Sequence, residues 1–355
     1  MLNFNSDYIC GAVPEIMEAL QHTNLEATPG YGLDHYCEEA RRLILDACGL
    51  QDGVVQFVIG GTEANSVVVD GLLGKCQGVL AAVTSHVNVH EAGTIEAFGH
   101  KVLTLPSPGG KISAGDIDRY VTDFYRDETW EHMVEPGMVY ITFPTELGTL
   151  YSRSELEEIA AVCRCHKLPL YIDGARLGYG LASPQCDVTL PEIAQIADIF
   201  YIGGTKQGAL FGEAIVSRRP GIIPRLFSLI KQHGALLAKG RLLGVQFKTL
   251  FTDGLYLRYA RHAVRMALKL KELMQAKGYE LYIDSCTNQQ FFILPNRIIE
   301  TLRKCAQFEL WGVPGAEKTP VRLTTSWSTT DADIEALAAL LSWSNRRKNG
   351  HTISC

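Results

Sequence analysis

The chain of 355 residues is long enough for two domains, or for one large α/β domain with a smaller one attached. Its formal net charge of −6, with no basic face evident in the sequence, argues against nucleic acid as the main partner. Charges or glycines interrupt every apolar run before it reaches the length of a membrane span, and the first residues lack the pattern of a signal peptide. We therefore expect a cytoplasmic protein that binds no membrane.

Short apolar runs typical of buried strands recur along the first two thirds of the chain. In chain order they are 54–59, 79–83, 101–105, 138–143, 168–172, 199–202 and 214–217. Helical patterns separate several of them, and this alternation predicts an α/β fold with a mainly parallel seven-stranded sheet covered by helices on both faces. The connection from Lys206 to the last run is too short for a crossover helix, so this strand should pair antiparallel.

One of the intervening helices has a recognisable start. Ser154 and Glu157 have the spacing of a capping box, which predicts that a helix opens there. Its apolar residues share one face of such a helix: Leu156, Ile159, Ala160 and Cys163. Cys163, Cys165 and His166 are close in sequence but do not share a helix face, so we expect no metal site.

After Pro220 the pattern changes. Helical stretches at 234–251 and 256–277 precede strands near 280–284 and 290–294, a helix near 297–305, a strand at 321–327 and a last helix at 331–343. The sequence therefore predicts a large domain at 14–252 and a smaller C-terminal α+β domain at 253–355, which residues 1–13 join.

Two polar residues stand where predicted strands end, Asp173 and Lys206, each flanked by glycine. Ligands of open α/β sheets bind just beyond the carboxyl ends of the strands. A lysine amine forms a Schiff base with an aldehyde, and pyridoxal phosphate (PLP) requires an acidic partner for its pyridinium nitrogen. The pair therefore favours a PLP site over two unrelated solvated side chains.

A glycine-rich turn follows the first predicted strand and opens a helix. Gly61 and Thr62 lie in this turn, where free N–H groups and the helix dipole favour an anion such as the cofactor phosphate. The alternative is an ordinary turn with Thr62 as the helix N-cap. Thr205, next to the lysine, is a second candidate phosphate ligand.

Three further residues have functional and structural alternatives of similar weight. His86 follows a strand end, where it can stack on a flat ring or act as an acid or base. Arg176 can turn towards the phenolic oxygen of the ring, or it is a surface arginine at a helix start. Arg322 lies in an apolar strand, where a bidentate pair with a substrate carboxylate would explain it, or it faces water on an edge strand.

In their order along the chain, these motifs resemble the threonine aldolase/β-eliminating lyase family of fold type I PLP enzymes, which are aspartate aminotransferase-like. The resemblance covers nearly the whole chain. The matching motifs are Asn5-Ser6-Asp7, Gly30-Tyr31-Gly32, Gly61-Thr62-Glu63-Ala64-Asn65, His86 with Glu91-Ala92-Gly93, Asp173-Gly174-Ala175-Arg176, Thr205-Lys206 and Val321-Arg322.

The resemblance implies roles for these residues. Lys206 would carry PLP, His86 would stack on its ring and Asp173 would bind its nitrogen. Arg176 and Arg322 would bind the cofactor oxygen and the substrate carboxylate, and Ser6 would also bind substrate. Family members are homodimers or homotetramers with the active site at a subunit interface, which Tyr31 and a basic residue near Lys231 would cross.

The sequence departs from the family at two positions. Glu146 occupies about the position of a second active-site histidine, and Lys231 replaces an arginine that would contact the cofactor across the interface. A partly buried carboxylate can still act as a base, because burial raises its pKa. The catalytic residues are thus expected to be Lys206, His86 and Glu146, with the identity of the base left open.

The expected reaction is aldol cleavage of an L-3-hydroxy-α-amino acid, similar to L-threonine or L-allo-threonine, to glycine and an aldehyde. A PLP-dependent β-eliminating lyase is the alternative enzyme, and a catalytically weak PLP-binding protein is the alternative outside catalysis. Products distinguish the two enzymes, because the lyase would give pyruvate and ammonia. No Gly-x-Gly-x-x-Gly follows the first strand, which disfavours a nicotinamide enzyme.

Overall fold

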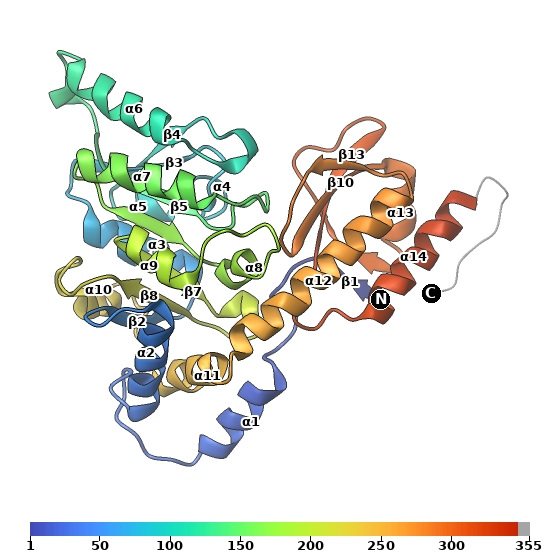
Figure 1. The fold of residues 1–355 in the computed structure, drawn as a ribbon, viewed down its shortest axis with the longest axis horizontal. Helices are drawn as coiled ribbons and strands as arrows, with labels where there is room; N and C mark the ends of the chain where they lie inside the picture. The colour runs from blue at the N-terminus through green and yellow to red at the C-terminus, as the bar shows by residue number, and fades with distance from the viewer. Residues whose placement is uncertain (347–355) are drawn as a thin grey trace.

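A seven-stranded sheet forms the centre of the larger part of the molecule in the computed structural model, which describes residues 1–346 (Figure 1). Its strands are β2 (Val54–Val58), β3 (Gln77–Ala82), β4 (Lys101–Leu105), β5 (Glu135–Thr142), β6 (Leu170–Asp173), β7 (Ile199–Gly203) and β8 (Glu213–Ser217). They lie in the order β2-β8-β7-β6-β5-β3-β4, and β8 alone runs antiparallel to its neighbours. The predicted sheet, including its antiparallel last strand, is confirmed.

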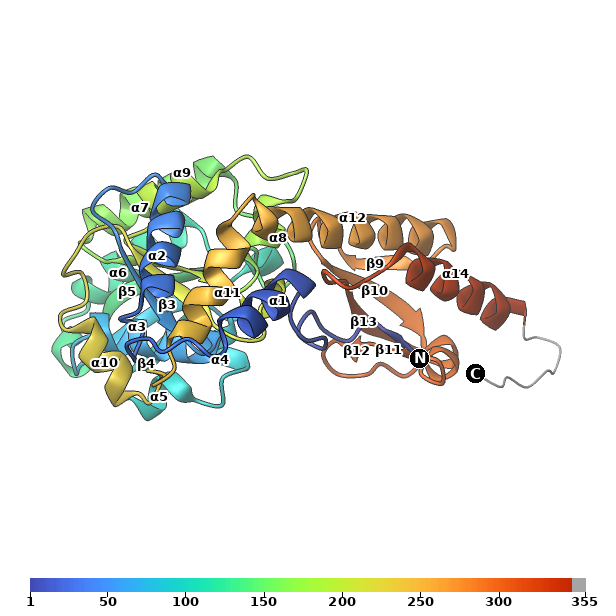
Figure 2. The same cartoon turned by 90° about the horizontal axis from the view of Figure 1, so that it is seen from below.

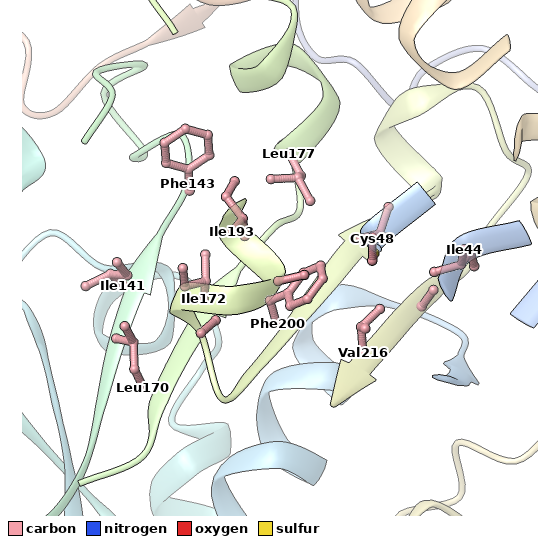
Figure 3. Close-up of a cluster of buried hydrophobic side chains, with 14 of the residues drawn as sticks. Ile44, Cys48, Ile141, Phe143, Leu170, Ile172, Leu177, Ile193, Phe200 and Val216 are labelled. Atoms are coloured by element: carbon pink, nitrogen blue, oxygen red, sulfur yellow. The ribbon is translucent and has the colours of Figure 1, made fainter. Parts of the chain in front are cut away.

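Helices cover both faces of this sheet. One face carries α2 (His35–Cys48), α6 (Ala114–Arg126), α7 (Arg153–Cys165), α9 (Leu190–Ile196) and α11 (Arg241–Phe251). The other carries α3 (Gly61–Leu72), α4 (His86–Val89), α5 (Thr94–Ala97) and α10 (Leu226–Gln232). Because successive residues of a strand point to opposite faces, Ile172 and Phe200 pack towards α2 and α9 (Figure 3), whereas Tyr171 and Tyr201 pack towards α3.

The smaller part of the molecule is built on a four-stranded antiparallel sheet in the order β12-β13-β10-β9. Its elements are α12 (Leu255–Ala276), β9 (Glu280–Ile283), β10 (Gln289–Pro295), α13 (Asn296–Leu302), β12 (Glu309–Leu310), β13 (Lys318–Thr324) and α14 (Asp331–Arg346). Figure 2 shows α12 reaching from the larger part along this sheet. The predicted α+β character is confirmed, while the domain limits at residues 13 and 252 remain predictions.

The chain begins in the smaller part. There β1 (Leu2–Asn3) pairs in parallel with β11 (Ala306–Gln307), and Phe4 is buried in the core of that part. The remaining elements are α1 (Pro14–Thr23), α8 (Leu177–Leu181) and short 3-10 turns at Pro108–Gly110, Trp130–His132 and Thr205–Gln207. None of the described helices combines the length and apolar character needed to cross a membrane.

Two helix starts differ from expectation. The capping box of α7 is Ser152 with Glu155, two residues before the predicted pair, and Lys111 also binds Glu155, at 2.6 Å. The helix predicted at 234–251 begins only at Arg241, since Gly234 adopts a φ of 76° that ends α10 and is incompatible with a continuing helix.

Candidate active site

A cavity of about 320 Å³ opens where β5, β6 and β7 end. Most of the predicted site residues line it: Gly61, Thr62, His86, Glu146, Asp173, Arg176, Thr205 and Lys206. A larger and more open hollow of about 770 Å³ lies beside β4 and α6, but none of the predicted site residues lines it. The chemistry therefore identifies the smaller cavity as the candidate active site.

Lys206 lies in the short 3-10 turn that directly follows β7. The turn ends at Gly208, whose φ of 97° reverses the chain towards β8. Burial lowers the pKa of Lys206, and the positive charge of Arg176 lowers it further, while nearby carboxylates oppose both effects. A lysine in such a site gives up its proton more readily and becomes a better nucleophile.

Asp173, the last residue of β6, is buried and held by three donors. Its Oδ2 accepts hydrogen bonds from the Tyr140 hydroxyl at 2.6 Å and from Asn65 Nδ2 at 3.0 Å, and its Oδ1 accepts from the backbone N–H of Ala175 at 3.0 Å. The next residue must be Gly174, because a Cβ there would lie 1.9 Å from the backbone oxygen of Tyr201. This close approach brings the ends of β6 and β7 together at the cavity.

The N-terminus of α3 forms another wall of the cavity. Gly60, Gly61 and Thr62 line it, and no side chain caps the helix, so its first N–H groups are available to an anion. The N-cap position belongs to Gly60, so the alternative of Thr62 as N-cap is wrong. The Thr205 hydroxyl, also predicted to bind phosphate, accepts the Gly212 N–H at 2.9 Å.

His86 and Glu146 both line the cavity and contact each other. The His86 ring bonds through Nδ1 to Glu91 Oε1 at 2.7 Å, and its backbone N–H donates to Glu146 Oε1 at 2.8 Å. Asn65 Nδ2 also donates to Glu91 Oε1, at 2.7 Å, which links the histidine to Asp173. Burial raises the pKa of Glu146, so this carboxyl tends to hold a proton.

Arg176 is paired with Asp7, which stands 169 residues before it in the chain. Its Nε and terminal nitrogen NH2 donate to the two carboxylate oxygens at 2.7 and 3.0 Å, and Asn288 Nδ2 donates to Asp7 at 2.9 Å. Burial alone would raise the pKa of Asp7, but the charges of Arg176 and Lys206 outweigh it and lower that pKa. Ser6 reaches the same carboxylate with a hydrogen bond of 3.5 Å.

The remaining predicted residues, Ser6, Tyr31, Lys231 and Arg322, are not among those that line the cavity. Arg322 donates to Gln289 Oε1 at 2.8 Å and forms an ion pair with Glu309. It is buried, so its alternative as an edge arginine in water is wrong. Lys231 Nζ lies 4.5 Å from the ring centre of Tyr31, so these two residues contact each other.

Sequence reasoning assigned no role to several residues that contribute to the site. Asp7, Asn65 and Glu91 stand inside motifs that carried the family resemblance, which was a usable signal. Glu213, a further cavity residue, begins the buried strand β8. A charged residue at the start of an apolar strand is unusual, and this was a second usable signal. Tyr140 gave no signal, because a tyrosine in a buried strand is ordinary.

These residues fit PLP. The cavity offers a half-buried amine for its aldehyde in Lys206, a fixed carboxylate for its ring nitrogen in Asp173 and an uncapped helix N-terminus for its phosphate at Gly61 and Thr62. The three groups come from separate elements that end at the same edge of the sheet.

Comparison with known proteins gives a consistent result. The model of the beta-eliminating lyase family matches residues 3–296. A low specificity L-threonine aldolase from a Pseudomonas species is 33% identical over 347 residues, covering 95% of this chain and 96% of the relative. Its counterpart from Pseudomonas aeruginosa is 32% identical over 346 residues, covering 95% of both.

Solved structures agree with the sequence comparisons. The threonine aldolase of Leishmania major superposes with a TM-score of 0.93 at 39% identity, covering 97% of this chain and 99% of that one. Aspartate aminotransferase from Thermus thermophilus superposes with a TM-score of 0.70 at 16% identity, covering 97% and 91%, which shows the shared fold.

Proposed function

The chain belongs to the beta-eliminating lyase family, and on this premise we propose that it cleaves an L-3-hydroxy-α-amino acid of the threonine type to glycine and an aldehyde. It is a PLP-dependent lyase, and the Pseudomonas and Leishmania relatives named as threonine aldolases support this substrate class. The observation that carries the proposal is that Lys206 and Asp173, delivered by adjacent strands, line the same cavity.

Bound PLP supplies an aldehyde that reacts with amines and a ring that accepts the electrons of the broken bond. Asp173, whose carboxylate is held in place by Tyr140 and Asn65, would bind the ring nitrogen and favour its protonated form. The uncapped N-terminus of α3 would hold the phosphate. Lys206 would supply the amine that anchors the cofactor.

The substrate carboxylate is bound by Arg176 and Arg322, with Ser6 nearby. The ion pair with Asp7 uses Nε and NH2 of Arg176, so its NH1 is the nitrogen left to reach a ligand. Arg322 has a buried Nε that lacks a hydrogen-bond partner among the described residues. A carboxylate placed there would satisfy a donor that is otherwise costly to bury.

The β-hydroxyl proton goes to His86 or to Glu146. Since Glu91 accepts a hydrogen bond from His86 Nδ1, the hydrogen of the neutral ring lies on Nδ1, and Nε2 is left as a proton acceptor. Glu146 accepts the backbone N–H of His86, and burial raises the pKa of its carboxyl, which favours a group that can hold a proton.

We further propose a homodimer or homotetramer in which Tyr31 and Lys231 reach the active site of a neighbouring subunit. Tyr31 is 41% exposed and contacts Lys231, and neither residue lines the cavity of its own chain, as expected for residues that complete another subunit's site. Light scattering at several protein concentrations would test the oligomeric state. A cytoplasmic location remains a prediction.

The first experiment is an absorbance spectrum of the purified protein with PLP, followed by addition of L-threonine, L-allo-threonine and phenylserine with aldehyde detection. We expect a cofactor band that changes on addition, with aldehyde released. Pyruvate and ammonia instead of aldehyde would favour the β-eliminating lyase. Lys206→Ala should abolish the band, and Lys101→Ala, at an exposed lysine of β4, should leave it intact. A band retained in the first variant would refute the assignment of Lys206.

A further inference from the structure

The face of the smaller sheet that bears Arg322 is turned away from the core of its own part. The residues on either side of Arg322 in β13 pack in that core, and alternate residues of a strand point to opposite faces. The guanidinium of Arg322 lies 5.3 Å from the ring centre of Trp311, which lies 6.5 Å from that of His90 in the larger part. The ring of His90 is 5.7 Å from that of His86, a cavity residue. The Arg322 face is therefore where the smaller part meets the larger one, next to the active site.

Polar atoms without partners collect on this face. Arg322 Nε, Thr324 Oγ1 and Gln289 Nε2 are buried and have no hydrogen-bond partner among the described residues. Thr324 stands two residues after Arg322 on β13, and Gln289 lies opposite Thr324 on β10, so all three side chains share the face. Buried polar groups are normally paired, because leaving them unpaired is costly. The unpaired atoms therefore indicate that this face receives a polar ligand.

Glu309 is the protein's own anion on Arg322. It begins β12 and lies directly opposite Arg322 on β13, and its Oε2 is paired with the terminal nitrogen NH2 of the guanidinium. Gln289 Oε1 accepts from the other terminal nitrogen, NH1, at 2.8 Å. A carboxylate can bind Nε and NH2 of an arginine side by side, as Asp7 does on Arg176. Glu309 occupies one nitrogen of the corresponding pair.

The two arginines hold their carboxylates in different ways. Asp7 binds both Nε and NH2 of Arg176, and its side chain is fully buried. Glu309 binds Arg322 through NH2, while Nε is left unpartnered, and 33% of the Glu309 side chain is exposed. A partly exposed carboxylate can return to water at little cost, whereas a fully buried one cannot. The geometry therefore makes Asp7 a permanent partner and Glu309 a replaceable one.

We propose that Glu309 is an exchangeable counter-ion of Arg322, displaced by the carboxylate of the amino-acid ligand, an inference that rests on the proposed role of Arg322 in carboxylate binding. The ligand carboxylate takes Nε and NH2 of Arg322, and the Glu309 carboxylate moves into solvent. No covalent bond changes and no proton is transferred. Glu309 thereby lowers the affinity of the site for carboxylates, because each of them must replace it.

The exchange matters because substrate and product carry the same carboxylate. Cleavage of the Cα–Cβ bond leaves the α-carboxylate unchanged, so its contact holds the amino acid equally before and after the reaction. A stronger contact would lower KM and retain glycine, with no gain in the rate of cleavage. Between ligands, Glu309 also compensates the charge of an arginine that is only 8% exposed, which would be costly to bury without an anion. A counter-ion that yields to the ligand meets both requirements.

The test measures the dissociation constants of glycine and glycinamide from the holoenzyme by calorimetry. Both ligands have the same amine position, but glycinamide lacks the carboxylate charge. Glu309→Gln keeps an oxygen that accepts from Arg322 and removes the negative charge. We expect this variant to bind glycine about fivefold more tightly, a modest gain because water screens a partly exposed anion, and to bind glycinamide as the wild type does. An unchanged or weaker affinity for glycine, or an equal gain for both ligands, would overturn the proposal.

Glu280→Gln is the matched control. Glu280 is an exposed residue of β9, the strand at the other edge of the same sheet, so its replacement removes the same charge away from Arg322. Its affinities for both ligands should equal those of the wild type. Arg322→Gln tests the premise, because it should weaken the binding of glycine and not that of glycinamide. If it weakens neither, the proposed role of Arg322 fails, and a wild-type protein that binds neither ligand would refute the proposed function itself.

A crystal structure of the wild-type holoenzyme with glycine needs no variant and covers the case in which Glu309→Gln does not fold. The glycine carboxylate should accept a hydrogen bond from Nε of Arg322. The Glu309 carboxylate should lie more than about 4 Å from the guanidinium nitrogens, beyond the range of an ion pair. A complex in which Glu309 is still paired with Arg322 would overturn the proposal.

Discussion

The ion pair between Asp7 and Arg176 is the residue-scale feature on which the site depends most. Both side chains are buried and meet through two hydrogen bonds. Taking two charges out of water is costly, and the pair is favourable only while both partners are present. Asp7 therefore fixes the orientation of Arg176 and compensates its charge, which makes an N-terminal residue part of the active site.

Asp7→Ala should lower the free energy of unfolding by about 3–5 kcal/mol, because it leaves the Arg176 guanidinium buried without its anion. Urea denaturation of the wild type and the variant measures this loss. Asp46→Ala removes the partner of Arg42 in an exposed pair and should change the stability by less than about 1 kcal/mol. Similar losses in the two variants would contradict the importance of the buried pair.

Glu146 makes the stability of the protein depend on pH. Its ordinary pKa is 4.5, and burial raises the pKa in the folded state. Above about pH 4.5 the unfolded chain releases this proton while the folded chain keeps it, so the folded state binds more protons and loses stability as the pH rises.

Glu146→Gln should remove this dependence while keeping an oxygen that accepts from the His86 N–H and the Thr142 hydroxyl. We expect the variant to gain stability relative to the wild type between pH 5 and pH 9, as measured by urea denaturation at each pH. Glu128→Gln, at an exposed position, should follow the wild-type curve. A constant difference between Glu146→Gln and the wild type across this range would show that Glu146 keeps its ordinary pKa.

At the scale of elements, the start of α7 shows how two equivalent local patterns are resolved. Ser152 with Glu155 and Ser154 with Glu157 both have capping-box spacing, and the structure uses the first pair. The Ser152 hydroxyl accepts the Glu155 N–H at 3.2 Å, and the Glu155 carboxylate accepts the Ser152 N–H at 2.7 Å. Ser154 instead donates to Glu158 on the surface.

Ser152→Ala should therefore cost about 1 kcal/mol of stability, the usual loss for an N-cap serine. Ser154→Ala should change the stability by less than about 0.5 kcal/mol, since an exposed hydroxyl is lost without a buried partner. Thermal unfolding of the two variants shows which of the two serines caps the helix. Equal effects, or a larger effect at Ser154, would mean that α7 begins elsewhere in solution.

At the scale of the whole molecule, the N-terminal segment joins the two parts. Phe4 is fully buried in the core of the smaller part, and three residues later Asp7 binds Arg176 of the larger part. The backbone of Thr324 donates to the Phe4 carbonyl at 2.8 Å and ties the segment to β13. The segment thus couples the packing of the smaller part to the position of a site arginine.

Phe4→Ala should lower the free energy of unfolding by about 3–5 kcal/mol, because a large aromatic ring is removed from a closed core. The same variant should weaken substrate binding, measured as KM, through the displaced Asp7. Phe227→Ala, at a ring that is 38% exposed, should change the stability much less and leave KM unaltered. A destabilised Phe4→Ala variant with an unaltered KM would mean that the segment does not couple the packing of the smaller part to the site.

The sequence by itself determined the central sheet and the positions of Asp173 and Lys206 at adjacent strand ends. Both follow from local properties, since apolar periodicity defines strands and parallel strands end at the same edge of a sheet. The glycine-rich turn before α3 was also predicted from a short local pattern. Its free N–H groups lie at the cavity, at the start of the helix that this pattern predicted.

The tertiary structure alone decided which charges meet. Asp7 pairs with Arg176 across 169 residues, and Glu213 accepts a hydrogen bond from the turn that carries Lys206. A buried charge takes whichever partner the packing brings within reach, because the energy of leaving it unpaired exceeds any local preference. That choice depends on contacts between distant segments, which no short window of sequence contains.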